Sequence, residues 1–210
     1  MRLRHIPGAA EAVAASPLVY SEKTAPGYKG HWRELFGNDA PLHLEIGMGR
    51  GKFILAQALA QPDIDFIGLE LREEMIMEAL EKVEDIPANL RFLWVNAGLL
   101  PELFAEGEVD KIYLNFPDPW PKSRHAKRRL TAASFLEMYE HILADEGILR
   151  FKTDNEDLFR WSVWSFSESG WQEVSVTYDQ PWEEAGIISE YETRYRRKGQ
   201  PICCGQWRKK

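Results

Sequence analysis

Long hydrophobic runs, a cysteine framework and an excess of positive charge are all missing from this 210-residue chain. No segment approaches the eighteen or so uncharged apolar residues that a membrane-spanning helix needs, so we expect no transmembrane protein. The two cysteines, Cys203 and Cys204, are adjacent. They match neither a disulfide framework nor a metal-ligand spacing, as expected of a protein in a reducing cytoplasm. The N-terminal segment leads into no apolar run with a small-residue cleavage site, so we expect no secretory signal.

The net charge of −7 argues by itself against nucleic-acid binding. The positive charges are clustered, however, since twelve of the 26 Lys and Arg residues fall within residues 122–129 and 194–210. A local basic surface on an acidic protein can bind a polyanion, because charges interact over a Debye length of roughly 10 Å. On charge alone, a polyanion site and two solvated surface loops are equally good interpretations.

Apolar β-type runs alternate with helical patterns after an N-terminal arm, residues 1–36, that is rich in Pro, Gly and Ala. Strands that are apolar on both faces and alternate with helices are typical of a parallel sheet covered on both sides. The last two runs lack a clear crossover helix between them and predict an antiparallel pair at one edge. The predicted strands are residues 42–46, 65–69, 90–95, 111–115, 148–152, 173–178 and 201–207. The sequence therefore predicts one α/β domain over residues 37–210, with a doubly wound, mostly parallel seven-stranded sheet and an antiparallel edge strand.

Two helices follow the fourth and fifth predicted strands. The first contains Phe135 and Tyr139 on one face, and Thr131 is placed to cap it. The second covers about residues 156–168. In a sheet of this kind ligands bind outside the carboxyl ends of the strands, so the residues that end each strand are the candidates for a site.

The first predicted strand ends in a glycine-rich turn, residues 45–52 (EIGMGRGK). Glycines at alternate positions let the backbone turn tightly and approach a ligand before a helix starts. A dinucleotide fingerprint, G-x-G-x-x-G, would need its third glycine where this chain has Lys52. Gly47, Gly49 and Gly51 instead form G-x-G-x-G, with Glu45 two residues before the first glycine. The pattern resembles the first motif of S-adenosylmethionine-dependent methyltransferases, and a glycine turn without a ligand is the alternative interpretation.

The next two strands end in polar side chains. Glu70 could accept hydrogen bonds from both hydroxyls of a ribose. NAD enzymes use the same device, and an acid at a helix start is favourable in any protein, so Glu70 does not identify the cofactor. Asn96 occupies a position where the methyltransferases commonly carry Asp or Asn near the adenine. As a single residue it is more typical of a turn.

The fourth strand runs into residues 115–130 (NFPDPWPKSRHAKRRL). Three prolines within five residues predict a rigid, extended segment that cannot be helical. Asp118 lies between two of them, and a cationic loop follows. Trp120 suits either a core or lid contact or base stacking, and His125 is better interpreted as a loop residue among phosphate-binding cations than as a catalytic base.

The same run resembles the signature of bacterial tRNA (guanine-N7)-methyltransferases, P-D-P-W-x-K-x-x-H-x-K-R-R. Four further stretches agree with this family, namely residues 28–32 (YKGHW), 152–156 (KTDNE), 189–192 (SEYE) and 199–202 (GQPI). The resemblance covers essentially the whole chain in order, with one departure: Ser189 stands where the family usually has Thr. It implies a class I methyltransferase fold, S-adenosylmethionine as cofactor, and methylation of guanine N7 in the variable loop of tRNA to give 7-methylguanosine.

The resemblance also implies roles for individual residues. Asp118 is the catalytic candidate. The cofactor-binding candidates are Glu45, Gly47, Gly49, Gly51, Glu70, Asn96 and Asp118. The candidates for holding the target base are Lys122, Asp154, Ser189, Glu190, Tyr191 and Glu192. The candidates for RNA contact are Arg124, His125, Ala126, Lys127, Arg128 and Arg129.

Some of these residues have alternative roles. Glu190 and Glu192 could accept from guanine N1 and its exocyclic amine, or form a solvated acidic pair. Asp154 could instead cap a helix. Members of the family occur as monomers and homodimers, so the resemblance allows a homodimer.

Two other functions are alternatives to methyl transfer. A nicotinamide-dependent oxidoreductase on the same kind of sheet would need the third fingerprint glycine, which Lys52 replaces. An RNA-binding protein that no longer binds a cofactor would show degenerate glycines or a lost strand-end acid, but Glu45, Gly47 and Glu70 are present. We therefore expect a cytoplasmic enzyme with tRNA as its partner and no membrane association.

Overall fold

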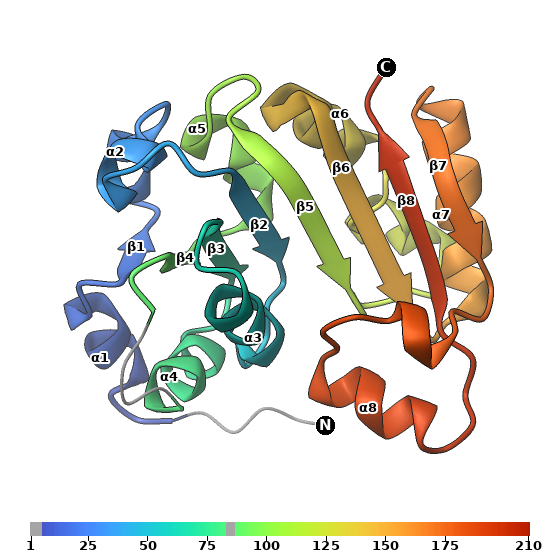
Figure 1. Cartoon of the computed structure of the whole chain (residues 1–210), viewed down its shortest axis with the longest axis horizontal. Helices are drawn as coiled ribbons and strands as arrows, with labels where there is room; N and C mark the ends of the chain where they lie inside the picture. Colours follow the sequence, from blue (N-terminus) through green and yellow to red (C-terminus); the bar gives the residue numbers. More distant parts are fainter. Residues whose placement is uncertain (1–5, 83–86) are drawn as a thin grey trace. The chain divides into compact units, whose positions relative to one another are not determined.

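The computed structural model describes residues 6–82 and 87–210, apart from the side chain of Glu190. The chain divides into two compact units, Met1–Phe104 and Ala105–Lys210, and each has its own set of strands and helices (Figure 1). Within the described residues, no helix is both long enough and apolar enough to cross a lipid bilayer.

The described part of the first unit contains parallel strands in the order β1-β4-β3-β2. Every residue of β2 is buried, as are the first five residues of β3, which explains why these strands are apolar on both faces. The strands are β1 (Val19–Ser21), β2 (Leu42–Ile46), β3 (Asp65–Glu70) and β4 (Leu90–Trp94). The helices are α1 (Ala9–Ala15), α2 (Trp32–Phe36), α3 (Lys52–Ala60), α4 (Glu73–Glu81) and α5 (Leu100–Leu103), with 3-10 turns η1 (Ala25–Tyr28) and η2 (Ala97–Leu99).

The described residues of the predicted N-terminal arm pack into this first unit. Strand β1, which the sequence did not predict, pairs in parallel with β4, so the described strands number eight and not the predicted seven. Trp32 is fully buried, and its indole N–H donates a hydrogen bond of 2.9 Å to the carbonyl of Leu103. The rings of Tyr20, Tyr28 and Phe104 surround it at centroid distances of 5.7, 5.4 and 5.7 Å. Aromatic packing therefore holds the arm in place.

The second unit contains strands in the order β5-β6-β8-β7. Strand β5 is parallel to β6, whereas β8 lies between β6 and β7 and is antiparallel to both. The predicted α/β class, its parallel strands and its antiparallel pair are confirmed. The strands are β5 (Val109–Asn115), β6 (Leu143–Thr153), β7 (Gln172–Thr177) and β8 (Cys203–Arg208). The helices are α6 (Ala133–Ile142), α7 (Glu156–Glu168) and α8 (Glu190–Arg196), with 3-10 turns η3 (Ser123–Arg128) and η4 (Trp182–Glu184).

Helix α7 has the bounds predicted from the sequence, and its start has a local cause. The side chain of Asn155 accepts a hydrogen bond of 2.7 Å from the amide of Leu158, which caps the helix. The expected cap of α6 was wrong, because Ala132 occupies that position. Thr131 is instead buried, with its hydroxyl 2.6 Å from that of Ser162 on α7. Burial beside a second hydroxyl thus outweighed its capping tendency.

Candidate active site

The turn between β2 and α3 contains the three predicted cofactor-binding glycines. Gly47, Gly49 and Gly51 have φ values of +75°, +56° and +69°. The amides of Gly47 and Met48 both donate to the carbonyl of Leu69, at 2.9 and 3.0 Å, which ties the turn to the end of β3. A Cβ added at Gly47 or Gly49 would meet no atom within 4 Å. The backbone of the turn therefore faces open space that a ligand can enter.

Gly51 differs from the other two because a Cβ there would lie 2.7 Å from the Cβ of Ala79 on α4. We expect Gly51→Ala to lower the free energy of unfolding by about 2–5 kcal/mol, the sum of left-handed strain and overpacking. Gly47→Ala is the matched control, since it adds the same strain without a neighbour, and should cost about 1–2 kcal/mol. Both values are measured by denaturant unfolding. Equal losses in the two variants would contradict a steric role for the contact with Ala79.

Glu70 ends β3, and its carboxylate lies beside the glycine turn. Oε2 accepts a hydrogen bond of 3.0 Å from the amide of Gly49. Oε1 accepts from the amides of Leu71 and Arg72 at 2.8 and 3.1 Å. The structure thus brings together two predicted cofactor-binding residues, Gly49 and Glu70, and fixes the orientation of the carboxylate.

The other two candidates in the first unit lie near strand ends. Glu45 is buried at 2% exposure, one residue before the end of β2. Asn96 is exposed after β4, and its side chain accepts a hydrogen bond of 2.8 Å from the amide of Gly98. Asn96 therefore forms the turn that its residue type favours, while its contact with a cofactor stays a prediction. An open glycine backbone beside an oriented carboxylate fits a cofactor that contains a ribose.

In the second unit, the segment after β5 places Asp118 within a strained turn. Phe116 and Trp120, on either side of it, have φ values of +52° and +43°. Such values are uncommon for bulky residues, and the strain is typically found at functional sites. The amide of Phe116 donates to the carbonyl of Lys152 at 2.8 Å, which ties the segment to the end of β6. Asp118 itself is exposed, so this segment presents a carboxylate to solvent on a constrained, non-helical backbone.

Arg129 holds the other end of the same segment. Its Nε and Nη2 donate to the carbonyls of Pro119 and Trp120 at 3.2 and 3.1 Å. Its guanidinium lies 4.3 Å from the centre of the Trp161 ring. Arg129 was predicted to contact RNA, and the structure shows that several of its donors are used to hold the backbone next to Asp118.

The remaining cations of residues 122–129, called the basic segment below, are exposed. Turn η3 carries most of them, and no acidic residue occurs in the sequence between Asp118 and Glu137. Trp120 packs against two residues of the segment, with the Arg128 guanidinium 5.0 Å from its ring centre and the His125 ring 5.7 Å away. The exposed cations are Lys122, Arg124, Lys127 and Arg128. The side chains are thus placed to present positive charge to a partner.

Only some of the cations in residues 194–210, called the C-terminal basic window, are exposed and, among the described residues, free of acidic partners. Arg196 is buried, while Arg208 and Lys209 form ion pairs of 3.2 and 3.0 Å with Glu146 and Asp145. Arg194, Arg197 and Lys198 are exposed. Counting cations in the sequence therefore overstated the charge that this window can offer to a polyanion.

Two predicted substrate-binding residues, Asp154 and Tyr191, are in contact. The Tyr191 hydroxyl donates to Asp154 Oδ2 at 3.2 Å. Its ring lies 5.0 Å from the Phe116 ring and stacks on Tyr195 at 4.3 Å. Burial, Tyr195 and the charge of Asp154 raise the pKa of Tyr191, which keeps its hydroxyl protonated. Asn155 caps α7, so the alternative interpretation of Asp154 as the helix cap is wrong.

The side chains of Ser189 and Glu192 form hydrogen bonds within the protein and are not open to a ligand. The Ser189 hydroxyl accepts from the amide of Glu192 at 3.1 Å and so caps α8. The Glu192 carboxylate is buried and pairs with Lys152 Nζ at 3.1 Å and with Arg196 Nε at 2.8 Å. The solvated acidic pair is therefore wrong for Glu192, and its carboxylate does not face solvent. The side chain of Glu190 lies outside the described residues.

Comparison with known proteins identifies the family. A family model described as "Putative methyltransferase" matches residues 39–205. The chain is 48% identical over 206 residues to the tRNA (guanine-N(7)-)-methyltransferase of Bacillus licheniformis, covering 96% of each chain. It is 49% identical over 205 residues to that of Geobacillus sp. (strain WCH70), covering 96% of this chain and 93% of the relative. The chain belongs to the tRNA (guanine-N(7)-)-methyltransferase family.

A solved structure agrees with the fold of this methyltransferase. The crystal structure of the 16S rRNA methyltransferase KamB is 16% identical to it, with a TM-score of 0.65 over 85% of this chain and 92% of that chain. At this identity the similarity shows the fold alone. Family membership also shows that the oxidoreductase alternative is wrong.

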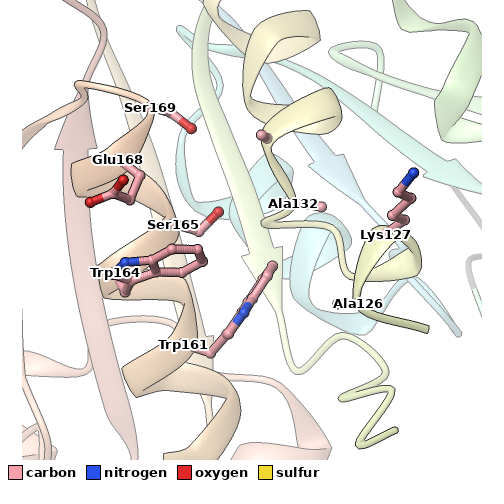
Figure 2. A pocket seen from close by; sticks show the side chains of 9 residues that line it. Ala126, Lys127, Ala132, Trp161, Trp164, Ser165, Glu168 and Ser169 are labelled. Atoms are coloured by element: carbon pink, nitrogen blue, oxygen red, sulfur yellow. The ribbon is translucent and has the colours of Figure 1, made fainter. Parts of the chain in front are cut away.

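A groove of about 220 Å³ lies beside the basic segment of the methyltransferase (Figure 2). Trp161 and Trp164 project from α7 and form one side of it, and Trp164 is 56% exposed. Ala126 and Lys127, two predicted RNA-contacting residues, line the other side with Ala132. The exposed lining is mainly apolar, so the groove offers chiefly packing surface.

The sequence did not reveal the structural roles of three residues near Asp118, Asp154 and Tyr191. Lys152 was noted only as part of a motif, although a lysine at the end of a buried strand signals a buried ion pair. Arg196 was counted among the surface cations. Phe116 showed no signal in the sequence, because a positive φ at a bulky residue is set by the packing around it.

Proposed function

We propose that this methyltransferase transfers the methyl group of S-adenosylmethionine to N7 of a guanine in the variable loop of tRNA. The observation that carries the proposal is the placement of Asp118. An exposed carboxylate on a strained backbone is followed directly by exposed cations with no intervening acid. Such a segment suits a substrate that is a base attached to a polyanion.

The reaction needs little from the protein beyond alignment and charge stabilisation. Guanine N7 is an acceptor with a free lone pair, so no proton must be removed before it attacks. When bound, S-adenosylmethionine would supply a methyl group on a sulfonium, whose sulfur leaves as a neutral thioether. Asp118 orients the base and stabilises the positive charge that develops on it as N7 gains the methyl group.

Other residues bind the two partners. The glycine turn, Glu45, Asn96 and the oriented Glu70 carboxylate bind the cofactor. Lys122, Asp154, Glu190 and Tyr191 bind the target nucleotide, with Lys122 as a donor and the carboxylates as acceptors. Ser189 and Glu192 contribute through α8 and not by touching the base. Folded RNA is bound largely through its backbone, so the basic segment contacts phosphates.

The test is methyl transfer from labelled S-adenosylmethionine to unmodified bulk tRNA, followed by nucleoside analysis. We expect the label in 7-methylguanosine. Label in another nucleoside would contradict N7 of guanine as the target. Cofactor binding without any transfer to tRNA would contradict the substrate.

The phosphate contacts predict how tRNA affinity depends on salt. Lys127→Gln/Arg128→Gln should reduce the slope of log K against log salt by about 0.7–0.9 for each phosphate that the protein no longer neutralises. Arg208→Gln/Lys209→Gln is the matched control, because those two cations already pair with Glu146 and Asp145. The slopes are measured by filter binding at several salt concentrations. A larger change in the control pair would assign the RNA surface to the C-terminal window.

A further inference from the structure

Three charged side chains form a cluster inside the second unit, called here the buried ion triad: Lys152, Glu192 and Arg196. Their side chains are 0%, 2% and 3% exposed. Lys152 Nζ lies 3.1 Å from Glu192 Oε1 and 3.4 Å from Oε2. Arg196 Nε and Nη2 each lie 2.8 Å from Glu192 Oε1. One carboxylate is therefore shared by two cations away from water.

The triad also binds the chain that leads into α8. Lys152 Nζ donates to the carbonyl of Ala185 at 3.2 Å. Arg196 donates to the backbone carbonyl of Gln180 and, at 3.3 Å, to its side-chain oxygen. Burial lowers the pKa of Lys152, while Glu192 opposes this shift. Burying three charges is costly even when they are paired, so the cluster is weak evidence for stability alone and suggests a specific geometric role.

Each end of the triad adjoins a residue of the candidate substrate site. Lys152 is two residues before Asp154, and its carbonyl accepts from the amide of Phe116 at 2.8 Å. Glu192 follows Tyr191 directly in α8, which lies beyond the carboxyl end of β6 (Figure 1). The Lys152–Glu192 pair thus links β6, which ends directly before Asp154, to α8, which carries Tyr191.

We propose that the buried ion triad positions Tyr191 against Asp154 and Phe116, so that Lys152, Glu192 and Arg196 are positioning residues that do not touch the target guanine. The proposal rests on the proposed function for the identity of the base. It gives Glu192 a role different from that of a direct acceptor for the guanine edge. The Tyr191–Asp154 hydrogen bond is exposed and holds α8 only weakly. The buried triad is what fixes the position of α8 relative to β6.

The first experiment compares Glu192→Gln with Glu156→Gln. The control removes the same charge from another i,i+4 pair, Glu156–Arg160, whose side chains are 55% and 63% exposed. We expect Glu192→Gln to lower kcat/KM for tRNA by about 30-fold, with the Kd for S-adenosylmethionine within about twofold of wild type, and the control to change neither. Wild-type kcat/KM in Glu192→Gln would overturn the proposal.

A double-mutant cycle distinguishes positioning from general stability. If Glu192 acts through Tyr191, Glu192→Gln should have little further effect in a Tyr191→Phe background. Fully additive losses would overturn the proposal. If Glu192→Gln fails to fold, Arg196→Lys takes its place in the same cycle, because it keeps the charge but loses donors to Glu192 and Gln180.

Two further measurements separate positioning from base contact and from the proposed function. The apolar triple variant Lys152→Met/Glu192→Leu/Arg196→Met should recover kcat/KM to within about fivefold of wild type, since packing replaces pairing. A folded triple variant as impaired as Glu192→Gln would overturn the proposal and assign the carboxylate to the base. If wild-type protein methylates no tRNA, the proposed function fails. Amide hydrogen exchange across α8 still tests the role of the triad. We expect Glu192→Gln to speed exchange in α8, and unchanged exchange would overturn the proposal.

Discussion

Asp118→Ala is expected to lower kcat for methylation of tRNA by about 100- to 1,000-fold, the usual effect of removing one group that stabilises transition-state charge. Asp118 is exposed, and its turn is held by the Phe116 amide and by Arg129. Removing the side chain should therefore leave the fold unchanged. The measurement is single-turnover methyl transfer at saturating S-adenosylmethionine, with the product identified as 7-methylguanosine.

Two comparisons define the role of Asp118. Asp118→Asn keeps the size of the side chain and should retain little activity, since the negative charge is what the reaction uses. Asp179→Ala removes an exposed carboxylate elsewhere in the same unit and should leave kcat unchanged. If the loss in Asp118→Ala disappears at high cofactor concentration, Asp118 serves cofactor binding and not the transition state.

The second large effect is expected at Glu70. Glu70→Ala should raise the Kd for S-adenosylmethionine by about 100-fold, because it removes charge-assisted acceptors worth about 1.5–3 kcal/mol each. It also leaves the amide of Gly49 without the 3.0 Å hydrogen bond that fixes the glycine turn. The measurement is isothermal titration of the apoprotein with the cofactor.

Ribose binding and turn support can be separated at this position. Glu70→Gln keeps one acceptor for the turn but loses the charge, so it should bind the cofactor about tenfold more weakly than wild type. Glu81→Ala removes an exposed carboxylate from the end of α4 and serves as the control. A cofactor Kd unchanged in Glu70→Ala would exclude Glu70 from the cofactor site.

Much of the scaffold could be read from the chain because its signals are local. Strand β2 has the bounds expected from its apolar run, and α7 begins after Asn155, as the pattern predicted. The antiparallel pair of β7 and β8 was predicted because no clear crossover helix was recognised between the strands, although the structure has the short helix α8 there. Strand β1 was missed because three half-buried residues, Val19–Ser21, carry too little periodicity to distinguish a strand from an arm.

In the candidate site, too, the features with local sequence signals could be predicted. Glycines at alternate positions indicated a tight turn, and the strand-end acid Glu70 indicated an acceptor for ribose hydroxyls. The structure joins the two, because Glu70 accepts a hydrogen bond from the amide of Gly49. The chemistry of Asp118 and the basic segment was also readable, because residue type and order alone define a carboxylate beside a cationic loop.

The sequence by itself therefore determined the α/β class, the family, the glycine turn and the identity of the charged residues. Only the tertiary structure decided which charges are exposed and which are buried or paired. It buries Glu192 between Lys152 and Arg196, engages Arg129 with the backbone beside Asp118, and strains Phe116. The reason is physical: propensity and periodicity act within a few residues, whereas burial and ion pairing depend on residues far apart in the chain, such as Lys152 and Glu192, which are 40 positions apart.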